Sequence, residues 1–188
     1  MIKIGITGSL ASGKTTASQI LSYRRGPLFS ADKVVKKLYK DKNFKKLISK
    51  KFNIKNNNLV KKKLTKMILT NRKNLKKLEK VIHPKVRMHM NKFTKENKNK
   101  KFLFYEIPLL IESKLMKHFN LIIFIKAKRS LRLKRFKLKR GDKKLFNLLD
   151  MKQFNDSKKI KYSDHVVVNE KNLKFLKKNL YGIISKYG

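Results

Sequence analysis

The sequence predicts an α/β protein in which helices cover both faces of a parallel sheet. Short apolar runs at residues 2–7, 27–31, 102–107, 121–125 and 165–168 each end at polar, glycine or proline residues, as strands do. Helical periodicity fills the intervals between most of these runs. Strands separated by helices favour right-handed parallel crossovers, so we expect a three-layer architecture with a sheet of about five strands.

Helices are expected between the strands. The stretch over about 44–99 has a helical pattern throughout, because Leu75, Leu78 and Ile82 recur three or four residues apart. Pro84 is expected to bend or restart this helix, since proline cannot donate the helical hydrogen bond. The other helices are expected over 14–23, from Asp32 onward, and over 129–139, 142–155 and 170–185.

The length of 188 residues fits one compact domain with helical additions to its sheet. We expect the core to comprise residues of about 1–40, 101–128 and 156–188. We also expect a helical substrate-binding insertion over about 41–100 and a helical lid over about 129–155.

The composition excludes several classes of protein. The chain has no cysteine, which excludes disulfide scaffolds, thiolate metal sites and cysteine nucleophiles and suits a reducing compartment. The first residues lack a basic segment followed by a long apolar run, and no apolar run approaches the roughly 20 residues of a membrane span. We therefore expect a cytoplasmic protein with no membrane partner. We also expect a monomer.

The formal net charge of +41 is the most unusual global property, since 52 Lys and Arg residues stand against 11 acids. Nucleic-acid binding would explain it, because clustered cations release counterions from phosphates. A compositional bias would also explain it, because lysine is frequent throughout the chain and is not concentrated in one tail. We favour the bias and expect no specific nucleic-acid partner, since no helix-turn-helix, RNP or zinc-knuckle motif is present.

A phosphate-binding motif follows the first predicted strand directly. Residues 8–15 read Gly-Ser-Leu-Ala-Ser-Gly-Lys-Thr and satisfy the pattern G-x-x-x-x-G-K-[ST], with a predicted helix immediately behind them. In such a P-loop, backbone N–H groups and the helix N-terminus bind phosphate oxygens, Lys14 reaches the β- and γ-phosphates, and the Thr15 hydroxyl binds Mg²⁺. The motif predicts a P-loop NTPase fold that binds ATP or GTP. The expected ATP-binding residues in and behind the loop are Gly8, Ala11, Ser12, Gly13, Lys14, Thr15 and Thr16.

Two acids stand at predicted strand ends, where ligands bind in an open parallel sheet. Asp32 follows the second strand and could accept a proton from a hydroxyl nucleophile, or it could only cap a helix. Glu106 ends the third strand and could support Mg²⁺, directly or through water, or it could only order a loop.

Two groups of basic residues could bind anions. His83 and Arg87 are four residues apart and would share a helix face, where they could hold an anionic acceptor. Arg132, Arg135 and Arg140 lie on a predicted helix and its exit, as in kinases whose mobile lid brings arginines over the transferring phosphoryl group. A solvated basic helix is the alternative for each group.

Taken in order, these motifs resemble those of the dephospho-coenzyme A kinases, from residue 2 to about 170. The phosphate loop is followed by Ser30-Ala31-Asp32, then by His83–Arg87, then by Ile107-Pro108-Leu109-Leu110-Ile111-Glu112, then by an arginine-bearing lid, and finally by a segment from Lys159 to Asn169.

The resemblance implies a role for each motif. Asp32 would be the base for the 3′-hydroxyl of the acceptor ribose, and the acceptor side would comprise His83, Arg87, Leu109 and Glu112. Arg135 and Arg140 would meet the ATP phosphates, and Asn169 would lie near the adenine. Mg²⁺ would be the cofactor, and ATP and dephospho-coenzyme A the substrates.

The chain departs from the family pattern at several positions. Ser9 and Ala11 replace loop glycines, which is tolerable only if neither backbone needs a positive φ. Ser30 replaces an aspartate, so Asp32 is the only candidate base of its triplet. Glu106 stands where aspartate is common, and the spacing from Arg135 to Arg140 is one residue longer than usual.

The leading hypothesis is an ATP-dependent kinase that phosphorylates the ribose 3′-hydroxyl of dephospho-coenzyme A, the last step of coenzyme A synthesis. Another nucleoside or nucleotide kinase of the same fold is the first alternative. A basic nucleic-acid-binding protein, motivated by the charge, is the second.

Overall fold

The computed structural model describes residues 1–55, 60–71, 73–139 and 141–188. The chain divides into two compact units. The first unit comprises Met1–Ser30 and Thr94–Gly188, and the second comprises Ala31–Phe93. Each unit has its own hydrophobic core.

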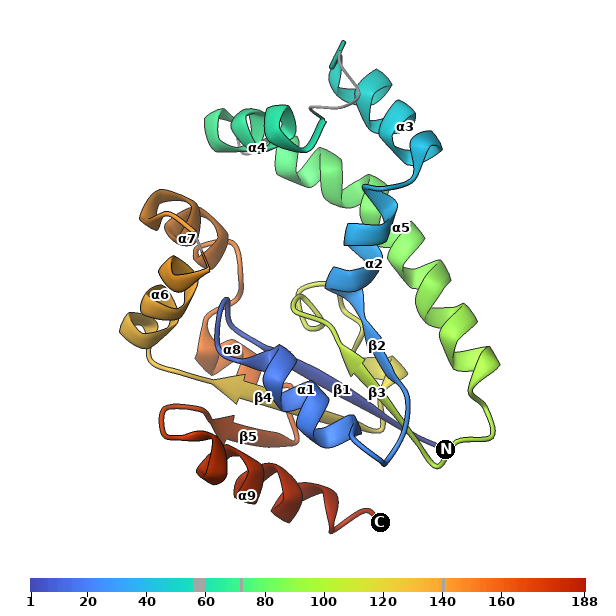
Figure 1. The fold of residues 1–188 in the computed structure, drawn as a ribbon, viewed down its shortest axis with the longest axis vertical. Helices are drawn as coiled ribbons and strands as arrows, with labels where there is room; N and C mark the ends of the chain where they lie inside the picture. Colours follow the sequence, from blue (N-terminus) through green and yellow to red (C-terminus); the bar gives the residue numbers. More distant parts are fainter. Residues whose placement is uncertain (56–59, 72, 140) are drawn as a thin grey trace. The chain divides into compact units, whose positions relative to one another are not determined.

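The first unit is built on a five-stranded parallel sheet with the order β2-β3-β1-β4-β5. The central strand is therefore the first one in the chain, as Figure 1 shows. The strands are β1 (Ile2–Gly8), β2 (Leu28–Ser30), β3 (Phe102–Glu106), β4 (Leu121–Lys126) and β5 (His165–Val168).

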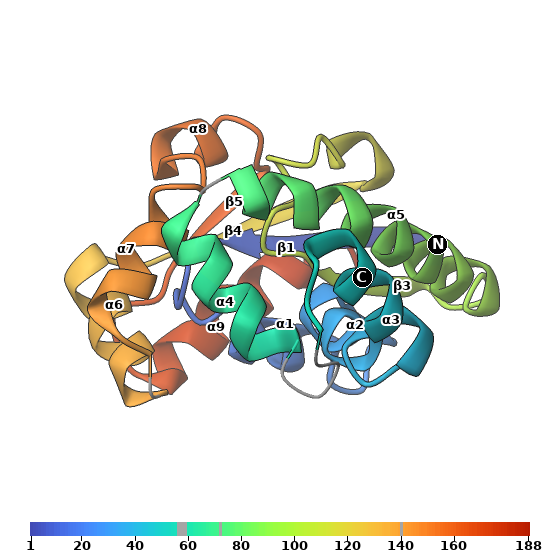
Figure 2. The same ribbon diagram turned by 90° about the horizontal axis from the view of Figure 1, so that it is seen from above.

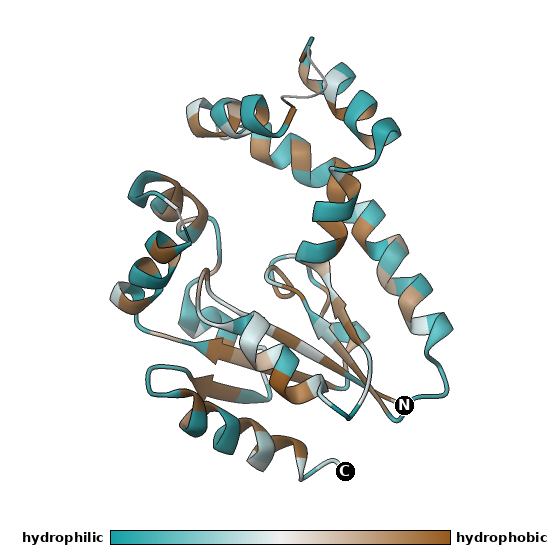
Figure 3. Cartoon of the chain, in the orientation of Figure 1, coloured by the Kyte–Doolittle hydropathy of each residue, from teal (hydrophilic) through white to brown (hydrophobic). Residues whose placement is uncertain are grey.

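Helices cover both faces of this sheet. Helices α1 (Lys14–Ser22) and α9 (Leu173–Ile184) lie on one face, and α8 (Asp156–Ile160) lies on the other (Figures 1 and 2). All five residues of β3 and the first five of β4 are buried, which explains why apolar side chains follow one another without alternation in both strands, up to Glu106 in β3 (Figure 3). The three-layer α/β prediction is thus confirmed.

The main core lies between the sheet and the pair α1 and α9. Fully buried side chains from the sheet, including Ile4, Ile6 and Ile123, pack against Leu21 of α1 and Leu180 of α9. This packing holds β1 and α1 together, and the chain between them forms the loop that carries the phosphate-binding motif.

Two further helices, α6 (Arg129–Leu138) and α7 (Lys143–Asp150), follow β4. Phe136 and Phe146 join them in an edge-to-face contact with ring centroids 5.6 Å apart. The helix expected over 142–155 is shorter than predicted. The chain leaves α7 after Asp150 and starts α8 at Asp156, because the Asn155 side chain accepts a hydrogen bond from the N–H of Lys158 and caps a new helix.

The second unit is helical throughout its described residues. Its helices are α2 (Ala31–Leu38), α3 (Lys42–Phe52), α4 (Val60–Thr70) and α5 (Lys73–Glu96), the last of which continues into the first unit. Asp41 caps α3 by accepting a hydrogen bond of 2.6 Å from the N–H of Phe44. The core of this unit is formed by buried apolar residues of all four helices, among them Leu38, Phe44, Ile48, Phe52, Leu64 and Leu78.

Pro84 does not restart a helix, as the sequence had suggested it could. It lies inside α5, which is continuous over 24 residues. An interior proline costs a helix about 3 kcal/mol. Apolar residues of the same helix, such as Leu78, Val81 and Ile82, pack in the core of the second unit and offset that cost.

No helix in the described part of the chain combines the length and the apolar character needed to cross a bilayer.

Candidate active site

The phosphate loop, residues 8–15, connects β1 to α1 and has two positions that only glycine fits. A Cβ atom on Gly8 would come within 2.5 Å of the carbonyl oxygen of Ile125. Gly13 has a φ of 99°, and a Cβ atom there would come within 2.1 Å of Asn169 Nδ2. These glycines let the backbone approach β4 and Asn169 closely enough to form the compact turn.

Ala11 adopts a backbone conformation that glycine prefers. Its φ is 59°, in the left-handed region, whereas Ser9 is not among the described non-glycine residues with positive φ. The condition under which both glycine replacements would be tolerated without strain is therefore not met at Ala11. The left-handed region costs a non-glycine residue about 1 kcal/mol or more, because Cβ crowds the backbone carbonyl oxygen.

Lys14, at the start of α1, is folded back over the loop. Its Nζ donates a hydrogen bond of 2.9 Å to the carbonyl oxygen of Ser9, and the side chain is buried. The Ser12 hydroxyl is also buried, and it has no hydrogen-bond partner among the described residues. An ammonium group and a buried hydroxyl at a turn of this kind are suited to binding phosphate oxygens.

Thr15 and Glu106 meet at the end of the loop. The Thr15 hydroxyl donates a hydrogen bond to Glu106 Oε1. Glu106 is the last residue of β3 and only 2% exposed, and it lies opposite Ile6 of β1 and Ser30 of β2 in the sheet register. Parallel pairing thus brings an acid to the edge of the sheet where the phosphate loop begins.

These two oxygen-bearing side chains suit Mg²⁺, which prefers oxygen ligands and keeps several waters or phosphate oxygens around it. No cluster of three or more His, Cys, Asp or Glu side chains that could hold a metal occurs among the described residues. A metal bound by Thr15 and Glu106 would therefore take its remaining ligands from a nucleotide and from water. The residues present fit that arrangement.

Arg135 and Asn169 meet at the carbonyl oxygen of Ser12. Asn169 Nδ2 donates to this oxygen at 2.8 Å, and Arg135 Nη1 donates to it at 3.3 Å. Arg135 Nη2 also donates to the carbonyl oxygen of Asn169 at 3.0 Å. The sequence predicted Arg135 and Asn169 for separate parts of the ATP site, and the structure places both against the phosphate loop. Arg140, the second predicted lid arginine, lies outside the described residues.

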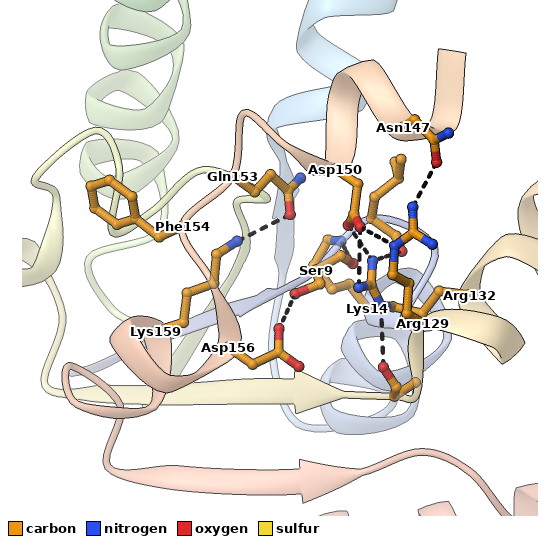
Figure 4. Close-up of polar contacts among 12 residues, drawn as sticks. Ser9, Lys14, Arg129, Arg132, Asn147, Asp150, Gln153, Phe154, Asp156 and Lys159 are labelled. Atoms are coloured by element: carbon orange, nitrogen blue, oxygen red, sulfur yellow. Dashed lines mark hydrogen bonds and ion pairs between the residues drawn. The ribbon is translucent and has the colours of Figure 1, made fainter. Parts of the chain in front are cut away.

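Arg132, which the sequence grouped with the lid arginines Arg135 and Arg140, is buried. Its Nη1 lies 2.5 Å from Asp150 Oδ1 and 3.2 Å from the carbonyl oxygen of Leu10, and its Nε donates to the carbonyl oxygen of Ala127 (Figure 4). The guanidinium group also stacks over Phe146. Arg132 therefore joins the phosphate loop, the end of β4 and α7.

A second buried ion pair lies beside the loop that follows β3. Lys159 Nζ is 2.8 Å from Glu112 Oε1, and the side chain of Lys159 is fully buried. Lys159 Nζ also donates to Gln153 Oε1 at 3.1 Å (Figure 4). Glu112 Oε1 also accepts the N–H of Phe154, while Oε2 is buried without a hydrogen-bond partner among the described residues. The family motifs contained both Glu112 and Lys159, but their pairing was not predicted.

Three of the predicted site residues belong to the second unit. Asp32 is exposed in the first turn of α2, where the helix dipole favours its negative charge. His83 and Arg87 lie one turn apart on α5, which runs through them without a break. Burial lowers the pKa of His83, and Arg87 lowers it further against the opposing effect of Glu79. The catalytic and acceptor-binding roles of these residues stay predictions.

The other predicted residues belong to the first unit. Thr16 is exposed in the first turn of α1, and Leu109 is half-buried in the segment that follows β3. Ser9, which replaces a family glycine, donates a hydrogen bond of 2.6 Å to Asp156 Oδ1 at the start of α8 (Figure 4). The hydroxyl that departs from the family pattern thus tethers the loop to a neighbouring helix.

The sequence is similar to those of dephospho-CoA kinases from other organisms. The chain is 32% identical over 182 residues to the dephospho-CoA kinase of Fusobacterium nucleatum, covering 94% of both chains. It is 33% identical over 187 residues to that of Bartonella quintana, covering 96% of this chain and 95% of the relative.

Solved structures give the same result. The dephospho-CoA kinase of Campylobacter jejuni superposes with a TM-score of 0.68 at 26% identity, covering 98% of this chain and 96% of the other. A Thermus thermophilus protein shares the fold with a TM-score of 0.82 at 24% identity, covering 100% of this chain and 98% of the other. The model of the dephospho-CoA kinase (CoaE) family matches residues 2–174. The chain therefore belongs to the dephospho-CoA kinase family.

Proposed function

We propose that this protein transfers the γ-phosphoryl group of ATP to the ribose 3′-hydroxyl of dephospho-coenzyme A, giving coenzyme A and ADP. The observation that carries the proposal is the family match over nearly the whole chain, on a structure whose phosphate loop ends beside an acid of the neighbouring strand. Little covalent chemistry is required of the protein in phosphoryl transfer, so positioning and electrostatic stabilisation are its main contributions.

The phosphate side of the reaction is assigned to the first unit. Backbone N–H groups of residues 8–15 bind phosphate oxygens, and Lys14 exchanges its bond with the Ser9 carbonyl for the β- and γ-phosphates. Thr15 and Glu106 would hold Mg²⁺, which would neutralise charge on the phosphates. The lid arginines Arg135 and Arg140 belong to this side of the reaction.

The acceptor side is assigned to Asp32, His83, Arg87, Leu109 and Glu112. Asp32 accepts the proton of the attacking hydroxyl, for which a charged carboxylate is needed, and its place in the first turn of α2 favours that charge. Glu112 keeps one buried carboxylate oxygen without a hydrogen-bond partner among the described residues, which supports a contact to a donor on the acceptor.

The decisive experiment is a mass balance. The purified chain is incubated with Mg·ATP and dephospho-coenzyme A, and coenzyme A and ADP are quantified by mass spectrometry. We expect equal amounts of both products. A parallel screen of nucleosides and nucleoside monophosphates measures ADP release, and a clear preference for one of these acceptors would overturn the proposal. Release of ADP without coenzyme A would show hydrolysis instead of transfer.

A further inference from the structure

We propose that Arg132, Arg135 and Asn169 are positioning residues that hold the carbonyl groups of the phosphate loop outward and thereby direct its N–H groups toward bound phosphate. This role differs from direct contact with phosphates or adenine, which the resemblance implies for Arg135 and Asn169. The inference rests on the proposed nucleotide binding and names the residues that prepare the loop for it.

The Ser12 carbonyl is the clearest case. Its oxygen accepts one hydrogen bond from Asn169 Nδ2 at 2.8 Å and another from Arg135 Nη1 at 3.3 Å. Arg135 Nη2 binds the carbonyl oxygen of Asn169, so the two donors are also joined to each other. Asn169 follows β5, and its backbone N–H donates to the Lys126 carbonyl at the end of β4. The donors of this carbonyl are therefore anchored in the sheet.

Planarity of the peptide bond transmits this constraint to the next N–H group. In a trans peptide, the C=O of one residue and the N–H of the next point in opposite directions, and the structure has no cis peptide bond among its described residues. Donors that fix the Ser12 carbonyl on one side therefore fix the Gly13 N–H toward the opposite side. Gly13 itself has a φ of 99°, and its lack of a Cβ atom leaves room for Asn169 Nδ2 beside it.

Arg132 acts in the same way two residues earlier in the loop. Its Nη1 donates to the Leu10 carbonyl at 3.2 Å, which directs the N–H of Ala11 away from the arginine. The ion pair with Asp150 and the bond to the Ala127 carbonyl hold the guanidinium group, which is only 6% exposed. With its N–H groups used in this way, Arg132 supports the loop and does not serve as a mobile phosphate ligand.

A preorganised loop gains affinity because the N–H groups need not be ordered when phosphate binds. Loss of one donor to the Ser12 carbonyl should weaken phosphate binding about tenfold, as the loss of one charge-assisted or buried hydrogen bond usually does. The loss should not depend on whether the ligand has a base, because the effect lies in the loop itself.

Two variants that leave the net charge unchanged test this role. Asn169→Leu removes the amide donor at similar side-chain volume, and Arg135→Lys keeps the cation but removes the fork that bridges two carbonyls. Lys134→Arg is the control, because Lys134 lies exposed on the same helix and the exchange also leaves the net charge unchanged. Affinities for ADP and for tripolyphosphate, which has no base or sugar, are measured by calorimetry, with melting temperature as the check on folding.

We expect both variants to weaken the affinity for ADP and the affinity for tripolyphosphate by the same factor, about tenfold. The control should change neither affinity by more than about twofold. The double variant should lose less than the product of the single losses, because both donors serve one carbonyl. The shift of the Gly13 amide resonance on adding tripolyphosphate should shrink in both variants and persist in the control.

If Asn169→Leu lost affinity for ADP alone, Asn169 would be an adenine contact and the proposal would be overturned. Unchanged affinity for both ligands would overturn the proposal as well. If Asn169→Leu does not fold, Arg135→Lys decides the matter by the same criteria. A wild-type chain that binds tripolyphosphate but forms no coenzyme A would contradict the proposed function and not this inference.

Discussion

The hydroxyl of Thr15 donates a hydrogen bond to the carboxylate of Glu106, which joins the first turn of α1 to the last residue of β3. The two residues are far apart in the sequence, and parallel pairing of β1 with β3 brings them together. The glutamate side chain is long enough to reach the threonine hydroxyl from the end of β3. This contact is the basis of the magnesium site that we propose.

Replacement of Glu106 by glutamine tests that site. The amide keeps the size and a hydrogen-bonding oxygen but removes the negative charge, so we expect the magnesium concentration that gives half-maximal rate to rise about tenfold. Initial rates measured against free Mg²⁺ at saturating ATP give this value. Glu170→Gln is the control, because Glu170 pairs with Lys128 at the surface. An unchanged magnesium requirement would remove Glu106 from the metal site.

Asp32→Asn tests the proposed general base. The amide cannot accept the hydroxyl proton, so we expect kcat to fall by a factor of about 10²–10⁴. The affinity for ADP should stay within about twofold, because the phosphate loop belongs to another part of the chain. Single-turnover rates and ADP titrations separate the two quantities. A variant that keeps normal kcat would show that another group takes the proton.

Ala11→Gly and Ser9→Gly form a matched pair, since each restores a glycine of the family pattern. We expect Ala11→Gly to raise the free energy of unfolding by about 1 kcal/mol, because Ala11 has a φ of 59°. Ser9→Gly should lower it by about 1 kcal/mol, because the hydrogen bond to Asp156 is lost. Urea unfolding curves measure both, and changes of the same sign would contradict the backbone argument.

Lys159→Met should destabilise the fold strongly. The substitution leaves Glu112 next to an apolar side chain, and removal of one partner of a buried ion pair costs about 3–5 kcal/mol. Adding Glu112→Gln should recover part of the loss, because the unpaired charge is then gone. Thermal and chemical unfolding of the single and double variants checks this. A single variant as stable as the wild type would show that the pair contributes nothing to stability.

The strands and the phosphate loop could be predicted from the sequence because their signals are local. A parallel strand buried on both faces is an uninterrupted apolar run, which is why β3 and β4 were found at nearly their observed bounds. The loop motif was equally clear, because its glycines and Lys14 occur at set spacings.

The contacts that support the site could not be predicted in the same way. With 52 basic residues in the chain, nothing in the local sequence distinguishes Lys159 or Arg132, which are buried, from exposed lysines of the same helices. Their partners Glu112 and Asp150 lie in other segments, so only the fold identifies them. The start of α8 was a different case, because Asn155 is a helix cap whose signal was present and was not used.

The order of strands in the sheet also determines when the sheet can form during synthesis. β1 pairs only with β3 and β4 in this sheet, and β2 pairs with β3, so neither early strand has a partner before residue 102. At about 5–20 residues per second, the ribosome needs roughly 5–20 s to reach that point. The helices of Ala31–Phe93 pack in a core of their own, so the partners in that core have all been synthesised before residue 102. The order of synthesis therefore makes the contacts of the helical unit available before those of the sheet that supports the phosphate loop.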